Sequence, residues 1–335
     1  MDFLQEIVKE VGNEYTKLAS DIEETEEFVD TGSYIFNGLV SGSIFGGVSG
    51  NKITAIAGES STGKTFFSLA VVKNFLDSNP DGYCLYFDTE AAVNKSLLAD
   101  RGLDLNRVVV SNVVTVEQFR SQALRAVDMY LKKPEDERKP VMFVLDSLGM
   151  LSTEKEIKDA IDDKQVRDMT KSQLIKGAFR MLTLKLGQAR IPLIVTNHTY
   201  DVIGSYVPTK EMGGGSGLKY ASSTIIYLSK KKEKDGTEVI GNLIKAKTHK
   251  SRLSKENKDV TVRLYYDDRG LDRYYGLLEL GEIGGLWKNV AGRYEIDGKK
   301  VYAKAIYKDP ELYFTPGVMD QLEQIAKREF SYGQN

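Results

Sequence analysis

The stretch Gly58-Glu59-Ser60-Ser61-Thr62-Gly63-Lys64-Thr65 decides the fold, because it matches the phosphate-binding pattern G-x-x-x-x-G-K-[ST] in full. A short apolar run at 53–57 precedes it, and a helix-like stretch at 65–75 follows it. The order of strand, glycine loop and helix is the context that gives this pattern its meaning. Backbone amides of the loop and the helix N-terminus bind phosphates in such loops. We expect Lys64 to reach the β- and γ-phosphates of a nucleotide, and the Thr65 hydroxyl to bind Mg²⁺.

Further apolar runs follow along the chain and alternate with helical stretches. The runs lie at 83–87, 108–110, 141–145, 191–196 and 224–228, and helical periodicity is clearest at 116–131 and 165–189. Continuous apolar runs between helices are typical of a largely parallel sheet that is covered on both faces. The sequence therefore predicts an α/β fold with a doubly wound core.

The two ends of the chain differ from this core. Residues 3–18 carry an apolar stripe at helical spacing, which predicts an amphipathic helix that packs on its own domain or on a neighbouring subunit. Residues 31–51 are rich in Gly and Ser and are expected to be irregular, whereas 260–266 alternate and predict an antiparallel edge. We divide the chain into an N-terminal helix with linker (1–30), an ATPase core (31–275) and a small C-terminal subdomain (276–335).

Composition excludes several classes of protein. The 335 residues are 41% hydrophobic and 28% charged, with a formal net charge of -2, which indicates a folded globular chain. One cysteine, Cys84, and two histidines, His198 and His249, cannot form an intrachain disulfide or a Cys/His zinc cluster. We find no apolar run of about 18 residues and expect no membrane partner. The N-terminus is acidic, unlike a targeting signal, so we expect a cytoplasmic protein.

The near-zero net charge conceals two segments of opposite sign. Residues 1–30 contain ten acidic and two basic residues, whereas residues 230–258 contain ten basic and four acidic residues. The overall balance argues against indiscriminate binding of polyanions. A local nucleic-acid site remains compatible with it, because the basic residues are concentrated in one segment.

Two acidic residues follow predicted strands, where ligands of parallel sheets bind. Asp146 comes directly after the run at 141–145, the place of a Mg²⁺-associated carboxylate of the Walker B type; the alternative is that it caps the next helix. Glu90 comes three residues after the run at 83–87. From there it could orient and deprotonate the water that attacks a γ-phosphate.

Five motifs, in this order, resemble the RecA family of recombinases. They are the loop at 58–65, Tyr-Phe-Asp-Thr-Glu at 86–90, Leu-Asp-Ser at 145–147, Thr-Asn-His-Thr-Tyr at 196–200 and Met-Gly-Gly-Gly-Ser-Gly at 212–217. The last two, with Lys250-Ser251-Arg252, are similar to the UvsX recombinases of T4-type bacteriophages. The phosphate loop alone is common to many ATPases, but the ordered set, over about residues 31–278, is far more specific.

The resemblance implies roles for single residues. Glu90 takes the place of the catalytic glutamate, and Asp146 that of the Walker B aspartate. His198, beside Asn197, occupies the switch position that senses the γ-phosphate, where bacterial RecA usually has glutamine and the phage branch has histidine. From the residues alone, a histidine at a strand end is more often structural, and that interpretation stays open.

The resemblance also implies contacts with DNA and with a neighbouring subunit. Residues 200–217 match the second DNA-binding loop, and 153–168 fall where the first lies, although these are charged and fit a surface helix nearly as well. The candidate DNA-binding residues are Gly213, Gly214, Gly215, Ser216, Gly217 and Lys219. Lys247, Lys250 and Arg252 are candidates for bases that reach the neighbour's ATP, as an arginine finger does, with the register open. The aromatic residue that stacks on adenine in the family is missing, since its place is about Leu97.

These observations predict a DNA-dependent ATPase that uses ATP and Mg²⁺ for DNA strand exchange in recombination, replication and repair. Expected partners are single-stranded DNA, homologous duplex DNA, further copies of the chain in a helical filament, and single-strand-binding and loader proteins. A phage-encoded chain would act in the host bacterial cytoplasm. The alternatives are a ring-forming ATPase of the same core, such as a replicative helicase, and a filament or mediator protein that binds ATP and DNA without turnover.

Overall fold

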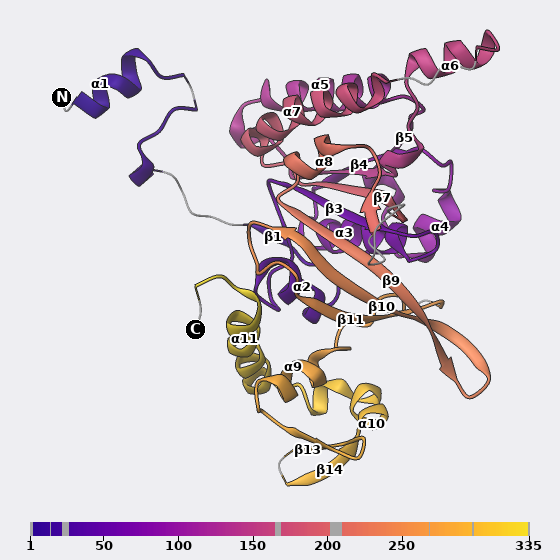
Figure 1. Cartoon of the computed structure of the whole chain (residues 1–335). Helices are drawn as coiled ribbons and strands as arrows, with labels where there is room; N and C mark the ends of the chain where they lie inside the picture. Colours follow the sequence, from indigo (N-terminus) through magenta and orange to yellow (C-terminus); the bar gives the residue numbers. More distant parts are fainter. Residues whose placement is uncertain are drawn as a thin grey trace.

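A nine-stranded sheet forms the centre of the molecule, in the order β11-β10-β9-β3-β7-β6-β4-β5, with β8 paired to the end of β7 (Figure 1). The computed structural model describes residues 3–13, 15–21, 27–164, 169–201, 210–267, 269–296 and 298–333. The strands of this sheet are β3 (Ile53–Gly58), β4 (Tyr83–Asp88), β5 (Val108–Asn112), β6 (Val141–Asp146), β7 (Leu193–Asp201), β8 (Lys210–Met212), β9 (Thr224–Asp235), β10 (Glu238–Ser251) and β11 (Asp259–Tyr265).

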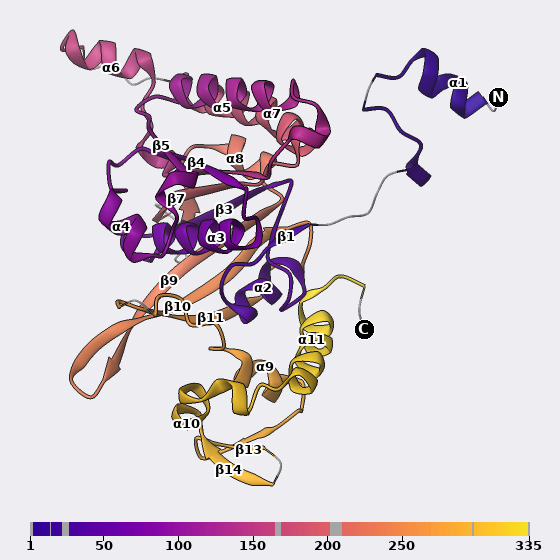
Figure 2. The same cartoon turned by 180° about the vertical axis from the view of Figure 1, so that it is seen from behind.

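The pairs from β9 through β3, β7, β6 and β4 to β5 are all parallel. Both sides of β3 are buried along its whole length, as its continuous apolar sequence predicts. Helices α2 (Tyr34–Ser41) and α3 (Lys64–Ser78) cover one face, and α5 (Val116–Leu131) and α7 (Lys171–Ala189) cover the other (Figure 2). The predicted α/β fold with a doubly wound sheet is confirmed.

The antiparallel edge consists of three strands, of which β9 and β10 form a long hairpin. Val260, Val262 and Leu264 are buried and alternate with more exposed residues, which agrees with the alternation in the sequence. The predicted strand at 224–228 is much longer in the structure, because β9 continues to Asp235 through exposed lysines. The end of the hairpin projects beyond the rest of the sheet (Figure 1).

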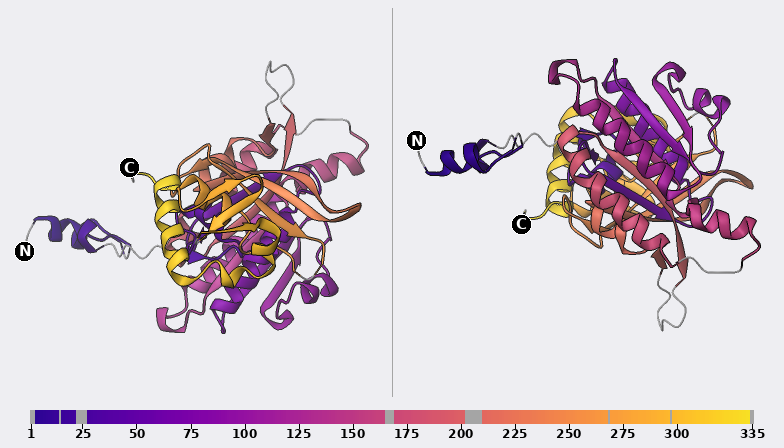
Figure 3. Two further views of the ribbon diagram at one scale, coloured as in Figure 1. Left: turned by 90° about the horizontal axis from the view of Figure 1, so that it is seen from below. Right: turned by 90° about the horizontal axis from the view of Figure 1, so that it is seen from above.

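The N-terminal region departs from the sequence-based expectation twice. Helix α1 (Phe3–Glu10) is shorter than the predicted helix at 3–18, because Gly12 and Asn13 follow it and the Asn13 side chain accepts a hydrogen bond from the Tyr15 amide (2.9 Å). None of its residues is buried, and it lies apart from the sheet (Figure 3). Residues 31–51, expected to be irregular, contain the buried helix α2, and β1 (Phe28–Val29) pairs with β2 (Val48–Ser49).

The C-terminal region adds a small antiparallel sheet and three helices. Its elements are α9 (Leu277–Ile283), β12 (Lys288–Val290), β13 (Arg293–Ile296), β14 (Lys299–Tyr302), α10 (Ala303–Lys308) and α11 (Pro316–Phe330). The helix-like stretch at 318–330 falls within α11, which packs against α2 and α9. Buried side chains of this region belong to the same apolar cluster as those of α2 and α3.

Shorter elements connect the layers. They are α4 (Lys95–Asp100), α6 (Glu154–Ile161), α8 (Ser216–Ala221) and the 3-10 turns Ala19–Asp21, Leu105–Arg107, Glu135–Glu137, Leu148–Met150 and Pro310–Leu312. Cys84 on β4 is fully buried, and this burial raises the pKa of its thiol. In the described ranges, no helix has the length and apolar character to cross a bilayer.

Candidate active site

The phosphate-binding loop joins β3 to α3, and its two glycines meet different backbone requirements. Gly63 precedes the helix with a φ of 90°, in the left-handed region that favours glycine. At Gly58, a Cβ atom would lie 2.8 Å from the carbonyl oxygen of Leu228 on the adjacent strand β9. Within the loop, the Thr62 hydroxyl donates a hydrogen bond to the Glu59 carbonyl oxygen (2.9 Å). The loop is thus shaped by its own sequence at Gly63 and Thr62 and by the adjacent strand β9 at Gly58.

Lys64, the first residue of α3, is buried against this loop. Its Nζ donates hydrogen bonds to the carbonyl oxygens of Gly58 (3.0 Å) and Glu59 (2.8 Å). Burial lowers the pKa of Lys64, and the charge of Lys230 lowers it further, whereas two nearby carboxylates act in the opposite direction. The lysine is therefore fixed at the loop, with a second cation close to it.

Asp146 ends strand β6, and its carboxylate accepts hydrogen bonds from three hydroxyl groups. Oδ2 accepts from Thr65 Oγ1 (2.7 Å) and from the Tyr86 phenol (2.8 Å), and Oδ1 accepts from Thr196. Burial, and then the carboxylate itself, raise the pKa of Tyr86 well above its usual value, so that the phenol stays a donor. Asp146 does not cap the following 3-10 turn, whose N-cap is Ser147. The alternative capping role is therefore wrong.

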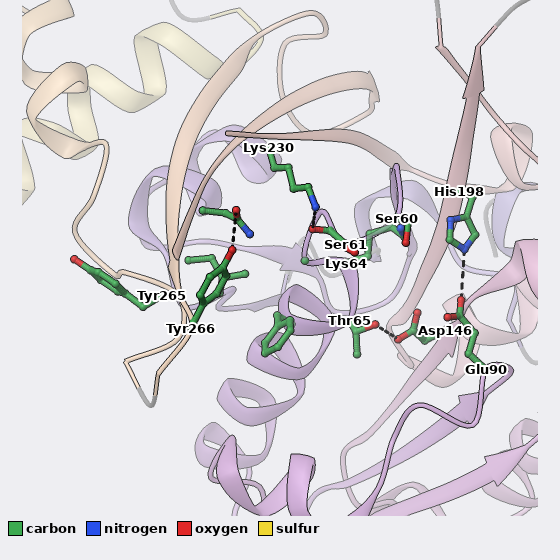
Figure 4. Close-up of a pocket in the computed structure, with 14 residues that line it drawn as sticks. Ser60, Ser61, Lys64, Thr65, Glu90, Asp146, His198, Lys230, Tyr265 and Tyr266 are labelled. Atoms are coloured by element: carbon green, nitrogen blue, oxygen red, sulfur yellow. Dashed lines mark hydrogen bonds and ion pairs between the residues drawn. The ribbon is translucent and has the colours of Figure 1, made fainter. Parts of the chain in front are cut away.

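The Glu90 carboxylate lies beyond the end of β4 and has two polar neighbours. Ser147 Oγ donates a hydrogen bond to Glu90 Oε1 (2.8 Å), and His198 Nε2 lies 3.4 Å from the same oxygen (Figure 4). Thr89 connects the two strand ends, because its hydroxyl oxygen accepts from the Ser147 amide (2.7 Å) and donates to the Ser147 carbonyl (2.9 Å). Glu90 is thus held in place by Ser147, which follows β6, and by His198 of β7.

The loop and these side chains line one pocket of about 350 Å³ (Figure 4). Among its lining residues are Ser60, Ser61, Gly63, Lys64, Thr65, Glu90, Asp146 and His198. The structure therefore brings together residues at the ends of β3, β4 and β6 with His198, which lies level with the end of β3 inside the longer strand β7.

Aromatic residues outside the sequence motifs also line the pocket. Leu97, at the place where the family has an adenine-stacking aromatic residue, packs against the apolar core instead. Phe66 of α3 and the pair Tyr265 and Tyr266 at the end of β11 line the pocket. The Arg101 guanidinium lies 4.3 Å from the centre of the Phe66 ring. Aromatic side chains therefore line the pocket from positions other than 97, and a guanidinium group already lies over the Phe66 ring.

The residues present fit a nucleoside triphosphate with Mg²⁺. The Thr65 hydroxyl and the Asp146 carboxylate are hard oxygen donors 2.7 Å apart, of the kind that Mg²⁺ prefers. In the part of the chain that the structure describes, no group of three or more His, Cys, Asp or Glu side chains could hold a metal. Mg²⁺ at this pair therefore needs further oxygen ligands from phosphates and water, which is its usual arrangement with nucleotides.

His198 and Asn197 connect this pocket to the glycine-rich segment. The Gly213 amide donates to the His198 carbonyl (3.1 Å), and Asn197 Nδ2 donates to the Gly213 carbonyl (2.8 Å). Asn197 Oδ1 also accepts from the His198 amide (2.8 Å). These hydrogen bonds therefore couple the position of His198 directly to that of Gly213.

The described part of the glycine-rich segment forms one wall of a second pocket, of about 230 Å³. Gly213, Gly214 and Gly215 line it together with Lys171 and Ser172 at the start of α7. Residues 202–209 of the expected second DNA loop lie outside the described residues. The other candidates, Ser216, Gly217 and Lys219, lie in helix α8, which corrects the expectation that the loop extends to residue 217.

Helix α8 packs closely on α7, which explains its glycine. A Cβ atom on Gly217 would lie 2.7 Å from the Lys176 Cα atom. Lys219 Nζ lies 3.6 Å from Glu211 Oε1.

The first DNA loop was expected at 153–168. Thr153 and Glu156 form a capping box at the start of α6 there, and none of the residues of α6 is buried, so 154–161 is a surface helix. Residues 165–168 lie outside the described part.

The three candidate trans-acting bases do not line the pocket of their own chain among the described residues. Lys247 and Arg252 are exposed. Lys250 is half-buried, and its Nζ donates to the carbonyl oxygens of Lys219 (2.7 Å), Tyr220 (3.3 Å) and Ser222 (2.7 Å) at the end of α8. Lys250 thus stabilises a helix C-terminus, where a cation is favourable.

Two other lysines contact the phosphate loop from outside. Lys210 of β8 forms an ion pair with Glu59, and Lys230 of β9 donates a hydrogen bond to the Ser61 carbonyl (2.8 Å). Sequence reasoning missed both, because their proximity depends on the pairing of β8 with β7 and of β9 with β3.

The phosphate loop, the carboxylates at neighbouring strand ends and the parallel sheet define a protein of the P-loop class with a RecA-like core. A model of the RecA N-terminal domain matches residues 2–272. The recombination and repair protein of enterobacteria phage T4 is 33% identical over 277 residues, which cover 82% of this chain and 69% of that protein. Protein RecA of Arthrobacter sp. (strain FB24) is 26% identical over 333 residues, which cover 98% of this chain and 90% of that protein. The chain belongs to the RecA family, and this prediction is confirmed.

Proposed function

We propose that the chain is an ATP-dependent DNA strand-exchange recombinase that forms filaments on single-stranded DNA. One observation carries the proposal: in a member of the RecA family, a single pocket brings together Lys64, Thr65, Glu90, Asp146 and His198. The hydrogen bonds between His198, Asn197 and Gly213 support a coupling of this pocket to DNA.

Hydrolysis proceeds by in-line attack of water on the γ-phosphate. Lys64 neutralises charge on the β- and γ-phosphates, and Thr65 and Asp146 would hold a Mg²⁺ ion, which would supply further charge stabilisation. Glu90 orients the water and takes its proton. The Ser147 hydroxyl, 2.8 Å from Glu90 Oε1, fixes the orientation of that carboxylate.

DNA binds at the glycine-rich segment and the start of α7. Gly214 and Gly215 offer backbone amides, and Lys171 and Ser172 offer a cation and a hydroxyl beside them. These are the groups with which proteins hold phosphates. His198 transmits the state of the γ-phosphate, because it contacts the Glu90 side of the pocket and bonds directly to Gly213.

Filament growth uses the N-terminal helix. Its apolar residues Phe3, Leu4 and Ile7 are exposed by 70%, 54% and 38%, so they are available to the next protomer rather than to their own domain. A head-to-tail contact of this kind gives an open helix or a ring. Lys247 and Arg252 reach the neighbour's nucleotide across the same contact.

A strand-exchange assay tests the proposal. With ATP, Mg²⁺ and single-stranded DNA, the chain should form joint molecules with homologous duplex, and not with heterologous duplex. Electron microscopy of the same mixture should show open helical filaments. Closed rings with duplex unwinding would indicate a helicase, and filaments without ATP turnover or pairing would indicate a mediator protein.

A further inference from the structure

Lys230 reaches the nucleotide pocket from strand β9. This strand runs parallel to β3, with Leu228 beside Gly58, where β3 ends and the phosphate loop begins. β9 continues past that point, so Lys230 lies alongside the loop. Ile226 and Leu228 belong to the apolar cluster under α3. Because alternate residues of a strand share a face, Lys230 points to the same side.

The contacts of Lys230 are those of a cation placed for an anion. Its Nζ donates a hydrogen bond to the Ser61 carbonyl oxygen (2.8 Å), at the exposed tip of the loop (Figure 4). Its charge lies close enough to Lys64 to oppose protonation of that lysine, although burial is the larger cause of the lowered Lys64 pKa. Among the described residues, no carboxylate forms an ion pair with Lys230. Two neighbouring cations therefore share a pocket, and an anion between them would relieve their repulsion.

We propose that Lys230 is a second phosphate-binding lysine of this pocket, acting in cis beside Lys64. It exchanges the Ser61 carbonyl for a phosphate oxygen when the nucleotide binds. The side chain is exposed and flexible enough for this exchange, and a charged hydrogen bond to phosphate is stronger than one to a neutral carbonyl. The inference rests on the proposed binding of a nucleoside triphosphate here.

The next residue provides a matched control. Lys231 has the same side chain and is also exposed, but it lies on the opposite face of β9. Lys231→Met removes the same charge from the same strand without changing the pocket. Lys230→Arg keeps the charge and tests whether the effect of Lys230→Met arises from damage to the fold.

The experiment measures dissociation constants for a slowly hydrolysed ATP analogue and for ADP, without DNA, at low and high salt. Lys230→Met should weaken binding of the analogue by about tenfold at low salt, as expected for a lost charged hydrogen bond. The difference from wild type should shrink at high salt, because partly exposed charges are screened. Lys231→Met should bind like wild type, and Lys230→Arg should retain most of the affinity.

Two results would overturn the inference alone. One is an affinity of Lys230→Met within about twofold of that of Lys231→Met at low salt. The other is a loss that does not change with salt, which would assign Lys230 to the shape of the loop. If the wild-type chain bound no ATP analogue, the proposed function would fail and the inference with it.

Discussion

The nucleotide pocket and the glycine-rich segment differ in how firmly their functional groups are held. In the pocket, Asp146 accepts hydrogen bonds from three hydroxyl groups and Lys64 donates to two carbonyl oxygens, at the carboxyl edge of the sheet. In the glycine-rich segment, the groups that we propose for DNA are backbone amides, and Gly214 and Gly215 have φ values of 83° and 72°. The pocket side chains are thus fixed by several hydrogen bonds, whereas the proposed DNA site consists mainly of backbone in conformations that favour glycine.

The largest effect is expected at the firmly held pocket. Lys64→Ala should reduce DNA-stimulated ATP hydrolysis by about 10³- to 10⁵-fold, because it removes the buried cation that stabilises charge on the transferred phosphate. Steady-state phosphate release with single-stranded DNA measures this. Turnover within tenfold of wild type would disprove the assignment of the pocket.

Glu90→Gln separates catalysis from assembly within the same pocket. Hydrolysis should fall by about 10²- to 10⁴-fold, because the amide cannot take a proton from water. ATP binding and filaments on single-stranded DNA should persist, since glutamine keeps the shape and can still accept from Ser147. Filament loss together with turnover, seen by electron microscopy, would instead indicate a structural role for Glu90.

His198→Ala tests the connection between the two regions. It should lower the ratio of DNA affinities measured with an ATP analogue and with ADP by about 5- to 150-fold, the usual range of coupling between two sites. Nucleotide affinity should change little. His249→Ala is the matched control, because this second histidine stacks on Tyr227 and does not line the pocket. An unchanged ratio in His198→Ala would make His198 a structural histidine.

A smaller effect is expected from the residue that positions Glu90. Ser147→Ala should lower kcat by about tenfold without changing KM, because one hydrogen bond to the carboxylate is lost. Ser147→Thr keeps the hydroxyl and should recover most of the rate. Equal losses in the two variants would show that packing around Ser147, rather than its hydrogen bond, sets the rate.

The smallest effect is expected at Lys250, which contacts the end of helix α8 next to the glycine-rich segment. Lys250→Met should reduce the free energy of unfolding by about 1 kcal/mol, because the carbonyl oxygens at the end of α8 lose their donor. Lys247→Met should leave stability unchanged, and urea unfolding without DNA compares the two. If Lys250→Met lost hydrolysis while its stability stayed unchanged, Lys250 would instead act in trans, on the ATP of the neighbouring subunit.

Features encoded in short stretches could be predicted from the sequence. The loop at 58–65 carries its own geometry, and Asp146 ends an apolar run whose burial follows from composition. Glu90 and Asp146 are expected near one another because parallel strands place their carboxyl ends at one edge of the sheet, whereas the expectation for His198 comes from the family resemblance. The structure brings all three into one pocket.

Two kinds of feature could not be predicted from short stretches of sequence. One depends on which strands pair in the sheet, and the other is a helix that is buried on all its sides. Lys230 reaches the loop only because β9 pairs with β3 across more than 160 residues of sequence. Residues 31–51 are expected to be irregular because they are rich in Gly and Ser. Helix α2 lies within them, and because Ile35 to Val40 are all buried, no polar face marks it in the sequence. Helix α1 was predicted too long, because the apolar spacing continues past Gly12 and Asn13, which end the helix.

The burial of Cys84 makes this chain suitable for site-specific fluorescent labelling. Its thiol lies inside β4 and its pKa is raised by burial, so little reactive thiolate is present at neutral pH. A cysteine introduced at an exposed position, such as Lys231, would therefore react with a maleimide dye while Cys84 stays unmodified. Filament growth on DNA could then be followed on single molecules without first replacing the native cysteine.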